Sequence, residues 1–466
     1  MLRYHLITYG CQMNKNDSER IAGLLESMGM TVSQESQGSD VIVLNTCSVR
    51  QHAEDRVFGQ MEYFAKLKQE KPDMVLAVTG CMPGRDAKKI FHKKMPWVDF
   101  YFPIKDLPQL PRWLCELRPA MANTGELQDD YFAIKPKRHT NKFQAYVSIS
   151  AGCDNYCTFC VVPASRGRER SRPLADVLAE VRSAVGDGAV EITLLGQNVN
   201  TYRPHDLTYH TVVPRDGMRS RAHASIDRQA SVGITKNNPF IDPFGVLLWE
   251  LNQMPTLKRI HFTAPNPQDM TQEVIEALSL PKHVNYLHIP VQSGANSVLK
   301  RMNRRYSREQ FFEMIDAIRA VRPSIALGTD IIVGFPGETE VDFNETLDLY
   351  QRVGFDISYN AMYSFRSGTT AARFFPDDVT QDEKKRRWTM LQDYMEEQTL
   401  NKNQCYQEQI VEVLVERFDE TRNICSGNSR EMKLVEFPGS RSLVGTIVSV
   451  RINQALTWIL RGSLTV

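Results

Sequence analysis

The first third of the chain repeats one unit, in which an apolar run of strand length ends in a cysteine. Polar segments with helical periodicity separate these runs, and we expect helices from about Asp17 to Met28, capped by Asn16 or Asp17, and from about 51 to 69. Alternation of strands and helices predicts a parallel sheet. The three runs are YHLITYGC (4–11), DVIVLNTC (40–47) and MVLAVTGC (74–81).

The three cysteines that end these runs are Cys11, Cys47 and Cys81. Small apolar thiols often end buried strands, so a single such cysteine has a plain structural explanation. Three of them in the same position should meet at one edge of the sheet, because the carboxyl ends of parallel strands lie side by side. Gly10 and Gly80 would let the backbone approach closely there. This pattern favours a metal site with an open position.

A second and longer alternation follows a polar linker. Six apolar runs with helical patterns between them predict a parallel barrel that is incomplete relative to the eight-stranded form. Polar, Gly-rich and Pro-rich segments follow the strands, at the end where parallel barrels place their chemistry. We expect the strands near 144–149, 190–195, 259–263, 286–290, 326–333 and 357–363.

After a charged helical region at 382–403, the pattern changes to short alternating runs joined by tight turns. These predict about five strands in a small antiparallel β-barrel. The predicted fold class is therefore α/β, with an N-terminal domain at 1–120, a linker at 121–142, a partial (β/α)6 barrel at 143–400 and a terminal β-barrel at 401–466.

Composition gives information on the cellular compartment of the protein and on a membrane as partner. The chain carries 56 Lys and Arg against 55 Asp and Glu, so net charge says nothing about binding. We find no secretory signal and no apolar run long enough to cross a bilayer, which predicts a cytoplasmic protein without a membrane partner. Nine cysteines in that compartment indicate metal ligands and buried thiols in preference to disulfides.

The strongest chemical signal is GCDNYCTFC (152–160), in which Cys153, Cys157 and Cys160 have the spacing C-x3-C-x2-C. A structural zinc site takes four ligands and a 4Fe-4S cluster has four irons, so three thiolates leave one position open. A zinc knuckle or three buried thiols is the alternative. No fourth Cys or His lies nearby, which favours an open iron-sulfur cluster.

Two further segments carry charge. RGRERSRP (166–173) places arginines at 166, 168, 170 and 172, which would share a face if the segment were extended and could contact a phosphate or carboxylate. Residues 203–240 interrupt the barrel with six Arg or Lys, three Asp and three His. We interpret this insertion as an ordered flap near the substrate.

The cysteine spacing with Phe159, followed by the polar loops behind it, resembles the radical S-adenosylmethionine (SAM) enzymes. In that family the free iron of the cluster binds SAM. The resemblance implies that Leu195, Gly196 and Gln197 present backbone groups to the methionine end of SAM. It makes Gln292, Ser293, Thr329 and Asp330 candidates for contacts with the carboxylate and ribose.

Taken over its whole length, the chain resembles the radical SAM methylthiotransferases, with a terminal barrel of the TRAM type. The stretches 153–173 and LLGQNVNTY (194–202) are most similar to the tRNA 2-methylthio-N6-dimethylallyladenosine synthases. That resemblance implies two 4Fe-4S clusters, on Cys153, Cys157 and Cys160 and on Cys11, Cys47 and Cys81. It also implies SAM as both radical source and methyl donor.

The implied substrate is N6-isopentenyladenosine at position 37, in the anticodon stem-loop of tRNA. The implied partners are an electron donor such as flavodoxin or ferredoxin, and a protein that delivers sulfur or iron-sulfur units. Three alternatives stay open. Enzymes of this architecture also act on threonylcarbamoyladenosine in tRNA or on an aspartate of a ribosomal protein, and a non-catalytic iron-sulfur protein that binds RNA would have closed clusters.

Overall fold

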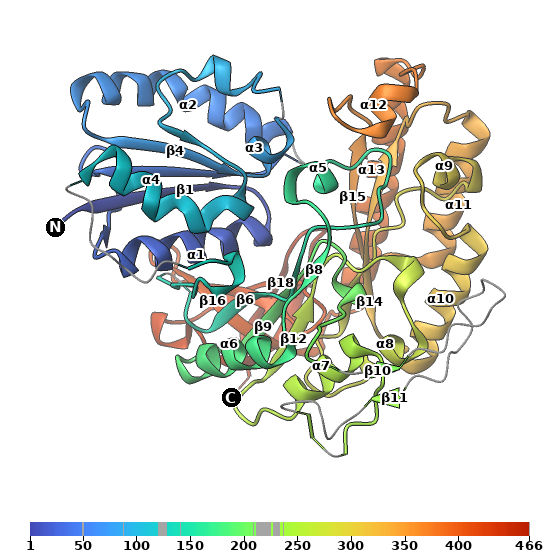
Figure 1. Ribbon diagram of the computed structural model, residues 1–466. Helices are drawn as coiled ribbons and strands as arrows, with labels where there is room; N and C mark the ends of the chain where they lie inside the picture. Colours follow the sequence, from blue (N-terminus) through green and yellow to red (C-terminus); the bar gives the residue numbers. More distant parts are fainter. Residues whose placement is uncertain are drawn as a thin grey trace.

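Three blocks of secondary structure follow one another along the chain in a computed structural model (Figure 1). It describes residues 1–48, 51–86, 88–119, 128–139, 141–207, 209–210, 225–226, 234–235 and 237–465. Most of the insertion for which we predicted a flap lies outside these residues, as does a smaller part of the predicted linker. The described ends of the insertion are anchored, because Leu207 and Phe240 are buried in the core of the second block.

The first block is a parallel sheet of five strands in the order β2-β1-β3-β4-β5. Its inner strands β3 and β4 are buried along their whole length, because both faces carry helices. The strands are β1 (Arg3–Tyr9), β2 (Thr31–Val32), β3 (Val41–Thr46), β4 (Val75–Gly80) and β5 (Phe100–Tyr101), and the helices are α1 (Gln12–Ser27), α2 (Gln51–Glu70), α3 (Cys81–Arg85) and α4 (Leu110–Leu117).

The first helix begins five residues earlier than its sequence predicts. Cys11 is the N-cap of α1, and the Oδ1 atom of Asn14 accepts hydrogen bonds from the Cys11 amide at 3.3 Å and from its thiol at 3.4 Å. Asn16 and Asp17, which we expected to cap the helix, lie inside it and are buried. Their polarity serves contacts with distant parts of the chain, described below.

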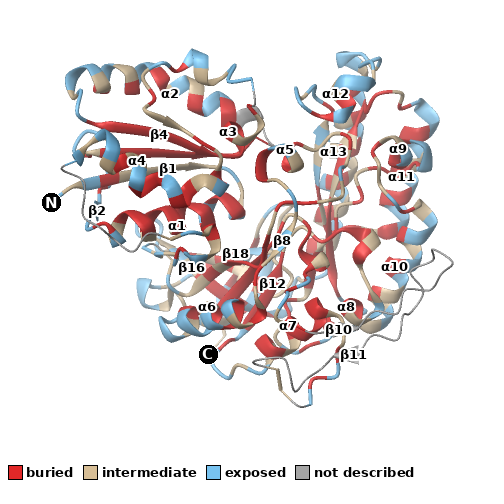
Figure 2. Ribbon diagram, viewed as in Figure 1, coloured by how far each residue is buried: buried red, intermediate tan, exposed pale blue. Residues whose placement is uncertain are grey.

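The second block has six core strands, as predicted, with helices around them. Strands β6, β9 and β12 form one parallel sheet and β13, β14 and β15 another, and a bridge between Ile260 and His283 joins the two sheets. The strands are β6 (Gln144–Ser148), β9 (Glu191–Leu195), β12 (Arg259–Phe262), β13 (Tyr286–His288), β14 (Ala326–Val333) and β15 (Ile357–Met362). Figure 2 shows how thoroughly strands such as β4 and β12 are buried.

The helices of this block cover the outside of the incomplete barrel. They are α6 (Leu174–Gly186), α7 (Pro243–Asn252), α8 (Gln272–Ala277), α9 (Asn296–Arg301), α10 (Arg308–Val321), α11 (Glu340–Val353), α12 (Thr370–Phe374) and α13 (Gln381–Gln404). No helix in the described part of the chain is both long enough and apolar enough to span a bilayer.

The third block is the predicted barrel of five strands, closed in the order β16-β17-β18-β20-β19. One detail differs from the prediction, because β18 and β20 pair in parallel. A closed ring with an odd number of strands cannot alternate direction at every step, so one parallel pair is unavoidable. The strands are β16 (Ile410–Asp419), β17 (Ile424–Ser429), β18 (Leu434–Pro438), β19 (Ile447–Ala455) and β20 (Leu460–Leu464).

The terminal barrel covers the amino ends of the core strands. Arg259, the first residue of β12, is 1% exposed and donates to the carbonyl oxygens of Asn428 and Glu412, both at 2.9 Å. Lys433 pairs with Asp356, just before β15, at 3.0 Å. These contacts lie at the opposite end of the strands from the polar loops. The terminal barrel therefore packs against the end of the core that faces away from those loops.

Candidate active site

The first three cysteines meet at the carboxyl edge of the N-terminal sheet. Tyr9, Thr46 and Gly80 are in register across β1, β3 and β4. Cys47 and Cys81 directly follow Thr46 and Gly80, and Cys11 lies two residues after Tyr9. The thiol of Cys47 is hydrogen-bonded to both of the others. The prediction that three strand-ending cysteines meet at one edge of the sheet is therefore confirmed.

Glycines make this convergence possible. Gly80 has φ +102°, and a Cβ there would lie 2.4 Å from the carbonyl oxygen of Thr46. A Cβ on Gly10 would lie 2.2 Å from Oδ1 of Asn14 and 2.9 Å from Cβ of Cys47. Neither position has room for a side chain.

The environment of this set favours thiolates on its two outer members. Hydrogen bonding from Cys47 lowers the pKa of Cys11 to about 6 and that of Cys81 to about 7, and the same contacts raise the pKa of Cys47. The guanidinium of Arg166 adds to the effect, because its Nε donates to Sγ of Cys81 at 3.3 Å. Thiolates are the form that binds iron, so the chemistry of these donors fits an iron-sulfur cluster.

The second set of cysteines lies on the loop after β7 (Ser150–Ala151). Gly152 starts the loop with φ +79°, and a Cβ there would lie 2.1 Å from the carbonyl oxygen of Arg168. Burial raises the pKa of Cys153 to about 11 and that of Cys160 to about 12. These thiols become good ligands when a metal replaces the proton.

Hydrogen-bond donors surround the sulfurs of this second set as well. Arg304 donates from Nη1 to Sγ of Cys157 at 3.4 Å, and the amide of Val162 donates to Sγ of Cys160 at 3.5 Å. Donors of this kind stabilise the negative charge of cluster-bound thiolates. Among the residues that the structure describes, no three His, Cys, Asp or Glu side chains are arranged to hold a single metal ion.

The two sets are joined by α5 (Val162–Arg166), which directly follows Cys160. A Cβ on Gly84 in α3 would lie 2.2 Å from the carbonyl oxygen of Ser165, so α5 packs directly on the N-terminal domain. Arg166, its last residue, is buried against Cys81 and pairs with Asp17 at 2.6 Å. One short helix therefore connects the two cysteine sets across the domain boundary (Figure 1).

The arginines after the second cysteine loop do not share a face. Arg166 ends a helix, and Gly167, with φ +81°, then turns the chain. Arg172 is also buried and pairs with Glu180 at 2.8 Å, whereas Arg168 and Arg170 are exposed. The prediction of a continuous arginine face was wrong, because the segment is not extended throughout.

The residues implied to bind SAM lie at the carboxyl end of β9, in the segment after β13 and in the middle of β14. Gly196 follows Leu195, the last residue of β9, and a Cβ on it would lie 2.7 Å from Oγ of Ser150. Gln197 comes next and is partly exposed. Gln292 has φ +71°, and its backbone bridges β14 by donating to the carbonyl oxygen of Asp330 and accepting from the amide of Ile332.

Two of these side chains are engaged within the protein. The Thr329 hydroxyl donates to the carbonyl oxygen of Ile289 at 2.9 Å and accepts from the amide of Val291 at 3.0 Å. The Ser293 hydroxyl contacts Oγ1 of Thr346 at 3.3 Å and accepts from the amide of Ala295. Both side chains are buried, and their hydrogen bonds hold the segment after β13 in place.

Asp330 belongs to a polar cluster that sequence reasoning missed. Its Oδ2 lies 3.1 Å from Nε2 of His288, and Nδ1 of His288 lies 3.2 Å from the hydroxyl of Tyr286. A Cβ on Gly328 would lie 2.0 Å from that hydroxyl. Tyr286 and His288 alternate along β13 and so share a face, a two-residue period that the sequence YLH does contain.

Arg366 is a second missed residue. It follows β15 in the segment SFRSGT, where burial lowers its pKa and the charges of Glu54, Arg85 and Cys47 act on it. The charge of Cys47 therefore acts on this loop of the barrel. The interdomain site is built from both sides.

Two family models match separate parts of the chain. Residues 3–103 match the family model described as "Uncharacterized protein family UPF0004", and residues 147–350 match the radical SAM superfamily. The chain is 40% identical over 475 residues to a tRNA-2-methylthio-N(6)-dimethylallyladenosine synthase of Carboxydothermus hydrogenoformans, with 99% of each chain covered. It is 39% identical to the synthase of that name from Geobacillus kaustophilus, covering 99% of this chain and 82% of that one.

Among solved structures, the chain is similar in fold to a radical SAM methyltransferase, TsrM, from Kitasatospora setae with cobalamin and a [4Fe-4S] cluster bound. The TM-score is 0.54 at 12% identity, covering 80% of this chain and 74% of that one. At this identity the likeness concerns the fold alone.

Proposed function

The chain belongs to the radical SAM methylthiotransferases, among the tRNA-2-methylthio-N(6)-dimethylallyladenosine synthases, and we propose that it adds a methylthio group to C2 of N6-isopentenyladenosine at position 37 of tRNA. The observation that carries the proposal is the pair of three-thiol sets joined by α5 and Arg166. Each set leaves one position of a four-iron cluster open.

The chemistry requires a cofactor. The C2 position of adenine has an unactivated C–H bond, which no side-chain acid, base or nucleophile readily replaces with sulfur. As a radical SAM enzyme, the protein uses SAM and a 4Fe-4S cluster, which when bound supply the radical that removes this hydrogen. A second cluster, as carrier of the inserted sulfur, is part of our proposal.

The protein's own residues hold and orient these groups. In our proposal Cys153, Cys157 and Cys160 hold the cluster that serves SAM, and Cys11, Cys47 and Cys81 hold the second. The backbone at Leu195, Gly196 and Gln197 faces the methionine end of SAM. Gln292, Ser293 and Thr329 shape the opposite wall through backbone groups, and Asp330 is the member with a partly exposed carboxylate, directed by His288.

The substrate base is a loop nucleotide. Adenine in a duplex is stacked and paired, so its C2 edge cannot enter an interdomain site, whereas an anticodon-loop base is splayed out at a cost of only a few kcal/mol. Burying the five carbons of the isopentenyl group would contribute roughly 2 to 4 kcal/mol, at about 0.8 for each methylene-sized group. We place the activity in the cytoplasm with tRNA, an electron donor such as flavodoxin or ferredoxin, and a sulfur-delivery protein.

The test compares three substrates with the reconstituted enzyme: a tRNA bearing N6-isopentenyladenosine, the unmodified transcript, and a peptide from the ribosomal protein. Mass spectrometry should detect the methylthiolated product on the first substrate. Equal rates on the first two would remove the specificity for the isopentenyl group. Preference for the peptide would overturn the substrate assignment.

A further inference from the structure

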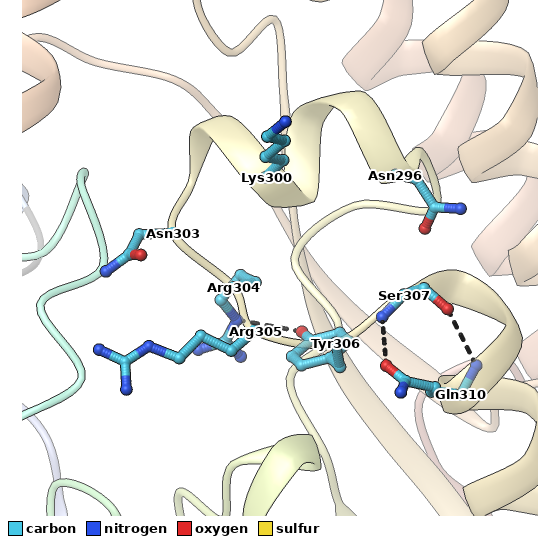
Figure 3. A pocket seen from close by; sticks show the side chains of 8 residues that line it. All are labelled: Asn296, Lys300, Asn303, Arg304, Arg305, Tyr306, Ser307 and Gln310. Carbon is cyan, nitrogen blue, oxygen red and sulfur yellow. Dashed lines mark hydrogen bonds between the residues drawn. The ribbon is translucent and has the colours of Figure 1, made fainter. Parts of the chain in front are cut away.

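A basic pocket of about 320 Å³ opens between the end of α9 and the start of α10, beside the second cysteine loop (Figure 3). Three cations line it, Lys300, Arg304 and Arg305. Lys300 and Arg305 are exposed, and neither side chain has an ion-pair or hydrogen-bond partner among the described residues. The function proposed above assigns no role to this pocket.

The wall of the pocket touches the cysteine loop directly. The side-chain amide of Asn303 donates from Nδ2 to the carbonyl oxygens of Asn155 at 3.1 Å and Tyr156 at 3.0 Å. Arg304 lines the pocket and donates from Nη1 to Sγ of Cys157 at 3.4 Å. Its Nη2 donates to the carbonyl oxygen of Pro290 at 2.7 Å. A single side chain therefore separates the pocket from a cysteine of the radical-generating set.

The pocket and the N-terminal domain lie on different sides of the cysteine loop. The segment after Cys160 packs on α3 of that domain, whereas the middle of the loop packs on residues 301–304. Figure 1 draws the N-terminal domain on one side of α5 and α9 on the other. A base held between the two cysteine sets leaves the pocket open to a different partner.

The rim suits a protein surface that carries negative charge. Tyr156 is 46% exposed at the tip of the cysteine loop, and exposed Tyr and Arg side chains are enriched at protein interfaces. Glu309 does not line the pocket, but it accepts a hydrogen bond at 3.0 Å from the lining residue Asn296 and keeps its negative charge. Arg308 pairs with Asp348 and Glu345. The residues that line the pocket itself include the cations Lys300, Arg304 and Arg305 and no acid.

We propose that an acidic one-electron carrier protein docks on Lys300, Arg305 and Tyr156 and delivers its electron through Arg304 and Cys157. This inference rests on the proposed function, since only a reductive reaction requires the electron. The carrier, a protein that holds a flavin hydroquinone, loses one electron for each SAM cleaved. That electron enters the C–S bond of SAM, which breaks to give methionine and the 5′-deoxyadenosyl radical.

The short distance between the pocket and Cys157 favours an electron carrier over RNA as the partner. Electron transfer slows steeply with distance, so a donor gains from a site one side chain away from the ligand. A phosphate backbone gains nothing from that closeness, and its base has to enter from the side of the N-terminal domain. Weak complexes of electron-transfer proteins need only small, charged interfaces.

The test uses the holoenzyme carrying K300E and R305E together, with a bacterial flavodoxin hydroquinone as probe. Binding of flavodoxin to the holoenzyme at low salt should weaken about tenfold or more. KM for flavodoxin in 5′-deoxyadenosine formation should rise in parallel. With dithionite as reductant the rate should equal that of the wild type, because a small reductant needs no docking surface.

The matched control is K66E with K105E, two exposed lysines of the N-terminal domain that give the same change in net charge. It should leave flavodoxin binding unchanged. Unaltered flavodoxin affinity in the K300E/R305E enzyme would overturn the proposal, and weakened tRNA binding in its place would assign the pocket to RNA. If the wild-type enzyme forms no 5′-deoxyadenosine with dithionite, the proposed function itself is contradicted.

Discussion

Arg166 donates to Sγ of Cys81 across the boundary between the barrel and the N-terminal domain, at 3.3 Å. The same guanidinium pairs with Asp17 at 2.6 Å, and both side chains are buried. Because Arg166 ends the helix that follows Cys160, this contact fixes one cysteine set relative to the other. It gives the interdomain site a defined geometry without a substrate.

Replacing Arg166 by Gln should destabilise the protein. The change leaves the Asp17 carboxylate buried without its cation, which typically costs about 3 to 5 kcal/mol. The double variant R166Q/D17N should be more stable than R166Q alone, since the buried charge is then removed with its partner. Urea denaturation of the cluster-free protein measures both effects. Equal stability of wild type and R166Q would show that the pair contributes nothing.

The cluster-loaded protein offers a second measurement at Arg166. Loss of the cation and of its hydrogen bond to the sulfur of Cys81 should lower the reduction potential of the N-terminal cluster. Arg166→Lys keeps the charge but cannot reach both Asp17 and Cys81 with separate nitrogens, so its potential should fall between those of wild type and R166Q. Redox titration followed by EPR tests this order. The same potential in all three proteins would reduce Arg166 to a structural residue.

Arg259 should hold the terminal barrel in place. It is buried between Glu191 and the backbone of β16 and β17, so Arg259→Gln should cost about 3 kcal/mol and loosen the barrel. Limited proteolysis should then release a fragment beginning near residue 401. Arg417→Gln, at an exposed site on the same barrel, should change stability by less than about 0.5 kcal/mol. Protection of the R259Q protein from cleavage would contradict this account.

Acid should destabilise the protein through two buried histidines. Burial, with the charge of His288, lowers the pKa of His261 to about 4; burial, with Arg322 and Arg430 close by, lowers that of His283 to about 3. Below pH 6.5 these two histidines therefore bind protons in the unfolded chain but stay neutral in the folded chain. Stability is lost as pH falls, by about 1.4 kcal/mol per pH unit for each histidine.

The variant His283→Asn tests this pH dependence. An asparagine can still donate to the carbonyl oxygen of Val284, as Nδ1 of His283 does, but it does not titrate. Between pH 6.5 and 4.5 the free energy of unfolding should fall by about 2 to 3 kcal/mol less in this variant than in the wild type. Parallel stability curves for the two proteins would refute the assignment.

The strands and the meeting of the first three cysteines could be predicted because both depend on local pattern. Apolar runs define strands, and equal strand-helix spacing brings their ends to one edge. Contacts between distant residues leave no such trace. Asp17 looked like a helix cap in the sequence, and only the fold shows that its carboxylate meets Arg166, far along the chain.

The arginine segment at 166–173 is a second case in which the sequence alone did not determine the structure. Alternating arginines predict a shared face only if the backbone is extended, and the left-handed turn at Gly167 removes that condition. The polar cluster of Tyr286, His288 and Asp330 could have been found in part. Alternation along β13 was visible, but the partner on β14 depends on the pairing register, which the sequence does not reveal.

The central claim is that two separate cysteine sets perform different parts of one reaction. The most direct measurement is made on the variant C11A/C47A/C81A, with SAM, a reductant and tRNA bearing N6-isopentenyladenosine, after its folding has been checked by circular dichroism. We predict that 5′-deoxyadenosine still forms and that no methylthiolated tRNA is detected by mass spectrometry. Loss of 5′-deoxyadenosine from this folded variant, or methylthiolated product made without the three N-terminal cysteines, would contradict the account.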